Sequence, residues 1–167
     1  DAKGWRVDGQ WPDLFVEKGV RVKMDESRMR ASVGPKNITT LSAKVVAREL
    51  DPQVKSLLPP GFSAKEFIAS LAKACDEVAA TQGASVPILS AYRTMAIQSQ
   101  SDQFWRDARK EKFKPLTADQ FRARLAAALK SGNTTTPDGR ALRLLPPLDP
   151  KDALFMYLHD ESRFAHV

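Results

Sequence analysis

The feature that most constrains the fold is a helix that begins after Ser63. Ser63 and Glu66 have the spacing of a capping box, in which each side chain satisfies the other residue's free backbone N–H. Behind them, apolar residues recur every three or four positions and so share one helical face: Phe67, Ile68, Leu71, Cys75, Val78 and Ala79. Gly83 is well placed to end the helix. The pattern predicts an amphipathic helix whose apolar face, Cys75 included, lies in a core.

Two further helices are expected in the same half of the chain. Pro87 predicts the first turn of a helix that runs through Tyr92 toward Ile97. Thr117 and Gln120 repeat the capping-box spacing, and they open a third helix with an apolar stripe that ends at Gly132. Short strands are expected around 141–145, 154–158 and 164–167.

Between the second and third helices the pattern is less regular. Phe104 and Trp105 predict either a continuation of the second helix or a short separate turn, and 109–115 reads as a solvated basic loop. Large aromatic side chains at isolated positions usually bury area. We therefore expect all three tryptophans, Trp5, Trp11 and Trp105, to be packing anchors.

The first half of the chain predicts strands and turns. Asp8-Gly9 breaks the segment Trp5–Trp11, and 20–24 alternates in the period of a half-buried strand. A short helix is expected over 41–50, stopped by Pro52. The stiff stretch Leu57-Leu58-Pro59-Pro60-Gly61 then marks a boundary. We expect an α+β protein with a strand-rich N-terminal region over 1–58 and a second domain over 62–167.

Composition limits the class of protein. Hydrophobic residues make up 43% of the 167 residues and charged residues 28%, which is typical of a folded globular chain. No apolar stretch approaches the roughly 18–20 residues that a membrane span needs. The single cysteine, Cys75, excludes an internal disulfide and suits a reducing compartment, so we expect a cytoplasmic protein. Because the chain opens on Asp1, we expect a fragment or a trimmed start.

The positive charge is concentrated in one segment. The net charge of the chain is +6, and 93–143 holds eleven basic residues against five acidic ones, so this segment accounts for the whole excess. Such asymmetry points to a polyanionic partner. The candidate nucleic-acid contacts are Arg93, Arg106, Arg109, Lys110, Lys112, Lys114, Arg122, Arg124, Lys130, Arg140 and Arg143.

The order of elements in the second half resembles a winged helix-turn-helix. The resemblance rests on Val86–Arg93, Thr117–Leu129, Ser131-Gly132 and the strands expected near 140–158. It implies that the third helix enters the DNA major groove, with Arg122, Arg124 and Lys130 as first contacts, and that Arg140 and Arg143 lie near the wing. The sequence departs from the pattern because about twenty residues, 97–116, separate the second and third helices where a short turn is usual.

These observations favour a non-catalytic DNA-binding protein of prokaryotic type, with DNA favoured over RNA. The basic insert could add phosphate contacts, with Phe113 available to stack on an unpaired base. Two other interpretations stay open for the same charges. They could merely solvate a loop and a helix face, or the domain could dock a protein partner in a larger assembly.

Signals for chemistry are weak. Two histidines and one cysteine are too few for a structural zinc site, and the eight glycines form no phosphate cradle, so we expect no metal, cofactor or catalytic residue. His159-Asp160-Glu161-Ser162 is expected to be a polar turn. A metal-dependent nuclease remains an alternative through the carboxylates Asp149, Asp152, Asp160 and Glu161, which have no recognisable spacing.

Overall fold

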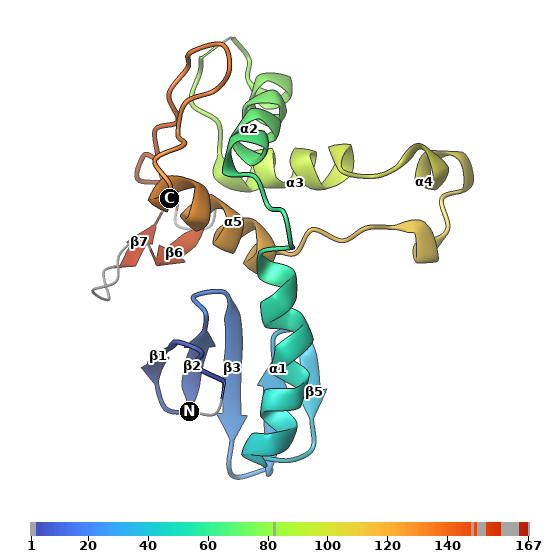
Figure 1. Cartoon of the computed structure of the whole chain (residues 1–167), viewed down its shortest axis with the longest axis vertical. Coiled ribbons are helices and arrows are strands. Elements are labelled where there is room, and N and C mark those ends of the chain that lie inside the picture. The colour runs from blue at the N-terminus through green and yellow to red at the C-terminus, as the bar shows by residue number, and fades with distance from the viewer. Residues whose placement is uncertain (1–2, 82, 148, 150–152, 158–163, 167) are drawn as a thin grey trace. The chain divides into compact units, whose positions relative to one another are not determined.

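A computed structural model of the chain describes residues 3–81, 83–147, 149, 153–157 and 164–166. The chain divides into two compact units, Asp1–Phe62 and Ser63–Val167 (Figure 1). The first unit contains a five-stranded antiparallel sheet and the second is mainly helical, which confirms the expected α+β class. None of the helices in the described ranges is both long and apolar enough to cross a membrane.

The N-terminal unit is a meander of five strands with one helix. The strands are β1 (Val7–Gln10), β2 (Asp13–Val16), β3 (Val20–Asp25), β4 (Arg30–Val33) and β5 (Lys36–Ile38), paired in sequence order. Alternation along β3 buries Val20 and Val22 and exposes Arg21 and Lys23, as the period of a half-buried strand predicts. The buried face packs against α1 (Ala43–Leu57), which contacts β3 and β4.

Two predictions for this unit are wrong. The strand β1 runs through Asp8-Gly9, because Gly9 adopts a φ of 98° that keeps it paired with Leu14. The helix α1 continues past Pro52 to Leu57. An interior proline costs a helix about 3 kcal/mol, but Leu50 and Leu57 lie on the same buried face, so continuing the helix buries a further leucine against the sheet.

The C-terminal unit has three long helices around one core. The elements are α2 (Ala64–Val78), α3 (Ile88–Gln98), α4 (Asp102–Asp107), the 3₁₀ turn η1 (Lys110–Lys112), α5 (Ala118–Lys130), β6 (Phe155–Tyr157) and β7 (Phe164–His166). The helix α2 packs against α3 and α5, and α5 also contacts β6. Their common core is made by Phe67, Ile68, Leu71, Ala74, Ala91, Met95, Phe121, Leu125, Ala128 and Met156.

Local capping signals in this unit are largely confirmed. Thr117 and Gln120 form the reciprocal capping box. Ser63 and Glu66 form one half of theirs, in which the Ser63 hydroxyl accepts the Glu66 N–H at 3.2 Å. Gly132 follows α5 with a φ of 73°, as expected of a residue that ends a helix. Gly83 does not end α2, which stops at Val78.

The strand predictions for this unit have mixed outcomes. Strands at 154–158 and 164–167 are confirmed as β6 and β7 within the described residues, and they pair antiparallel. The strand expected at 141–145 is wrong. Ala141 makes only an isolated bridge with Thr135, because the chain there forms a tight hairpin.

Candidate nucleic-acid interface

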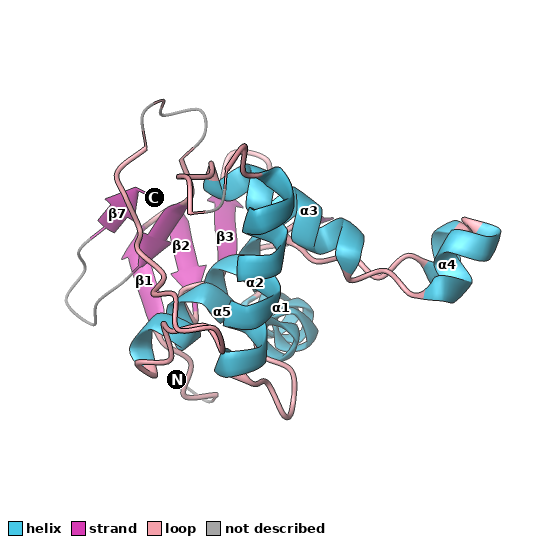
Figure 2. Ribbon diagram, turned by 90° about the horizontal axis from the view of Figure 1, so that it is seen from above, coloured by secondary structure: helices cyan, strands magenta, loops and turns pink. Residues whose placement is uncertain are grey.

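Between α3 and α5 the chain makes an excursion, here called the arm, over Ser101–Lys114. It contains α4 and η1, and in both views it extends away from α2, α3 and α5 of its own unit (Figures 1 and 2). The choice left open by the sequence is settled in favour of a separate element. The Ser101 hydroxyl caps α4 by accepting the Phe104 N–H, and neither α4 nor η1 contains a fully buried residue.

One buried amide holds the two ends of the arm together. The Gln100 side chain is 8% exposed; its Oε1 accepts the Lys114 N–H at 2.8 Å, while its Nε2 donates to the Lys114 carbonyl at 2.8 Å. The same Nε2 donates to the Ala96 carbonyl of α3 at 2.7 Å. The amide thus pairs with both backbone groups of Lys114, as a neighbouring strand would, and closes the base of the arm.

A second anchor lies beside the first. The Tyr92 hydroxyl of α3 donates to the carbonyl of Leu116 at 2.7 Å, and the Leu116 side chain is buried. Burial raises the pKa of the Tyr92 phenol above its ordinary value. The chain that leaves the arm is therefore fixed to α3 before α5 begins.

The arm carries a cluster of three aromatic rings. The Phe104 ring lies 5.1 Å from the Trp105 ring in a T-shaped contact and 5.6 Å from the Phe113 ring. Trp105 is 59% exposed and Phe113 is 45% exposed. The prediction that the tryptophans are packing anchors is wrong for Trp105 and also for Trp11, which is 55% exposed.

The five basic residues of the arm fall into two groups. Arg109 and Lys112 pair with the carboxylate of Asp107, at 2.9 and 2.8 Å. The other three, Arg106, Lys110 and Lys114, are exposed and have no ion-pair partner among the described residues. The structure thus brings five of the sequence-predicted contacts together on one excursion, where they stand against the three acidic residues Asp102, Asp107 and Glu111.

The basic residues of α5 are in a different state. The Arg122 side chain is only 17% exposed and pairs with Asp119 at 2.7 Å. Arg124 is half-buried, and loss of hydration lowers its pKa. Because α5 is covered by α2 and by β6, Lys130 is the one of these three predicted contacts that lies fully exposed.

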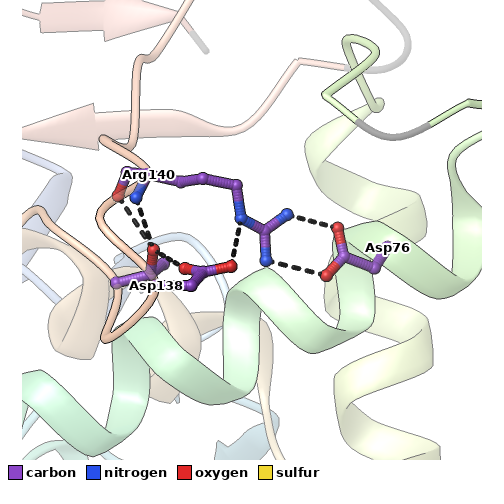
Figure 3. A network of polar contacts seen from close by, with 4 residues as sticks. Asp76, Asp138 and Arg140 are labelled. Atoms are coloured by element: carbon purple, nitrogen blue, oxygen red, sulfur yellow. Dashed lines mark hydrogen bonds and ion pairs between the residues drawn. The ribbon is translucent and has the colours of Figure 1, made fainter.

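Arg140 is engaged in a network of ion pairs (Figure 3). Its two terminal nitrogens donate to the two carboxylate oxygens of Asp76 on α2, at 2.6 and 2.9 Å, and its Nε donates to Asp138 at 2.7 Å. The Thr136 hydroxyl donates to Asp138 and also accepts the Arg140 N–H. The network fixes the 134–142 hairpin to α2, so the charge of Arg140 is balanced locally. Arg93 and Arg143 are exposed elsewhere on the unit.

The Arg140 network predicts a pH dependence of stability. The guanidinium holds the pKa of Asp76 below its ordinary value of about 4. A carboxylate with a lowered folded-state pKa stabilises the fold above its unfolded pKa, and this stabilisation is lost as the pH falls through the folded pKa. We therefore expect Asp76→Asn to be less stable than the wild type at neutral pH, with the difference shrinking below about pH 4.

Urea unfolding of both proteins over a pH series measures this difference. Glu111→Gln is the matched control, because Glu111 is an exposed carboxylate of the same unit without an ion-pair partner among the described residues. If the difference in the free energy of unfolding between Asp76→Asn and wild type stayed constant down to acid pH, this result would contradict the role assigned to the Arg140 network.

Only some of the residues considered for metal and nucleophile chemistry lie in the described part of the chain. No group of three or more His, Cys, Asp and Glu side chains gathers there. Cys75 is half-buried and burial raises the pKa of its thiol, which disfavours a nucleophile. Asp149 is exposed, whereas Asp152 and the predicted turn 159–162 lie outside the described residues.

Sequence reasoning missed the residues that build the arm. Gln100 belongs to no motif, and its hydrogen-bond partner Lys114 lies 14 residues away in the sequence. One signal for the arm was available in the sequence. Phe104 and Trp105 are surrounded by charged residues and have no apolar residues at helical spacing, so they do not form the apolar stripe of a buried helix. The chain matches no protein-family model, no curated protein and no solved structure at a significant level.

Proposed function

We propose that the C-terminal unit binds nucleic acid, double-stranded DNA foremost, without catalysing a reaction. The observation that carries the proposal is the arm, where five basic residues stand against three acidic ones and the exposed Arg106, Lys110 and Lys114 have no ion-pair partner among the described residues. The Gln100 amide anchors this excursion at its base. Phosphate contacts from such side chains release counterions and supply sequence-independent affinity. Arg109 and Lys112 would add to the positive potential while orienting the loop through Asp107.

The scaffold for this arm would be winged-helix-like. Three helices, α2, α3 and α5, share one core and are followed by the antiparallel pair β6–β7, which is the element order of that fold. In this proposal the arm replaces the short turn before the third helix. It takes over much of the phosphate contact, because Arg122 and Arg140 are already paired with carboxylates.

The proposal is tested by removing the three free charges. Arg106→Gln, Lys110→Gln and Lys114→Gln together are expected to weaken binding to a duplex about tenfold at moderate salt. They should also flatten the dependence of log K on log salt by about 0.9 per lost phosphate contact. Fluorescence anisotropy with a labelled duplex, titrated between about 50 and 200 mM salt, measures both quantities.

The matched control changes net charge equally at other places. Lys44, Lys65 and Lys73 are exposed, lie on α1 and α2, and have no ion-pair partner among the described residues. Changing these three to Gln should leave the affinity nearly unchanged. If both triple variants lost affinity equally, total charge and not the arm would account for binding.

A protein partner with an acidic surface is the second candidate function. It is favoured by the exposed rings of Trp105 and Phe113, since aromatic residues and arginine are enriched in the cores of protein interfaces. This alternative expects that neither single- nor double-stranded oligonucleotides bind at low salt.

A further inference from the structure

We propose that Trp105 stacks on an unpaired base, so that the arm directs the chain to junctions between duplex and single-stranded nucleic acid. The inference rests on the proposed function and adds the form of nucleic acid that is preferred. It starts from the exposure of Trp105, whose ring contact with Phe104 leaves more than half of the residue open.

Contacts within the aromatic cluster hold the Trp105 ring in place. Phe104 contacts both Trp105 and Phe113, so it joins α4 to the chain that follows η1. The Gln100 amide fixes the base of the same excursion. A ring held in place before binding loses less conformational freedom when a base stacks on it, which favours affinity.

The chemistry of the arm fits nucleic acid better than an apolar protein surface. Every large apolar side chain in 101–114 is aromatic, and Arg106, Lys110 and Lys114 are interleaved with the rings. Bases offer aromatic faces and the backbone offers phosphates, so one strand satisfies both kinds of group. In a continuous duplex the faces of the bases are already stacked, and an exposed indole therefore needs an unpaired base.

The experiment compares three labelled probes: a blunt duplex, the same duplex with a short single-stranded tail, and the single strand alone. Wild type is expected to bind the tailed duplex more tightly than the blunt one. Trp105→Ala should weaken binding to the tailed duplex and the single strand about tenfold, and leave blunt-duplex binding within about twofold. Trp105→Phe, which keeps an aromatic face, should recover part of the loss.

Trp11→Ala is the matched control, because Trp11 is an equally exposed indole in the N-terminal unit. It should leave all three affinities unchanged. Equal wild-type affinity for tailed and blunt duplexes, or the same loss on every probe in Trp105→Ala, would overturn the stacking role while leaving the proposed function intact. Absence of binding to any probe at low salt would overturn both and favour protein docking by the same rings.

Discussion

Phe121→Ala is expected to destabilise the C-terminal unit by about 3–5 kcal/mol. Phe121 on α5 is completely buried, and its ring contacts those of Phe67 on α2 and Tyr92 on α3, with centroids 5.8 and 5.2 Å apart. Truncation removes a side chain that touches both neighbouring helices through ring contacts, and it leaves a cavity that tightly packed walls fill only in part. Urea unfolding followed by circular dichroism measures the loss.

Phe113→Ala provides the comparison for Phe121→Ala, because it deletes the same atoms from an exposed position on the arm. Because Phe113 is 45% exposed and its ring contacts that of Phe104, we expect a smaller loss, on the order of 1 kcal/mol. If the two variants were equally stable, Phe121 would not be the centre of the helical core. Loss of nucleic-acid binding in Phe121→Ala alone would say nothing about the arm, since its scaffold would be lost.

Helix starts were the most predictable part of the fold because they are coded locally. A cap and its partner lie three residues apart, as Ser63 and Glu66 or Thr117 and Gln120 do, and neither pair needs the rest of the chain to form. The α1 helix shows the opposite case. Pro52 is a local stop signal, but the buried face that contains Leu50 and Leu57 is defined only by the sheet.

The candidate site was predictable in composition and not in geometry. Counting charges located the basic segment, and five of its basic residues lie on the arm. It could not show which charges are compensated, because the partner of Arg140 is Asp76, 64 residues earlier in the chain. Counting charges also could not show that α5 is covered on two sides. An apolar stripe identifies the buried face of a helix, but it does not tell how far the residues beside that stripe are buried.

The arm itself provides the second large expected effect, through Gln100. Gln100→Leu keeps a side chain of similar size but removes both hydrogen bonds to Lys114 and the one to Ala96. We expect a loss of about 1–3 kcal/mol in the free energy of unfolding, since backbone groups that are left without a partner account for most of such a cost. The closed base of the arm should also open.

Amide hydrogen exchange tests this opening at one atom. The Lys114 N–H donates to the side-chain oxygen Oε1 of Gln100, and no backbone acceptor for it is found among the described hydrogen bonds. Its protection should therefore fall to that of an open loop in Gln100→Leu. Gln100→Glu keeps the acceptor and should preserve much of that protection. Amides in the middle of α2 should stay protected in both variants. If the Lys114 amide were as slow in Gln100→Leu as in wild type, the arm would be held by its aromatic cluster and the Tyr92 contact, and Gln100 would have no positioning role.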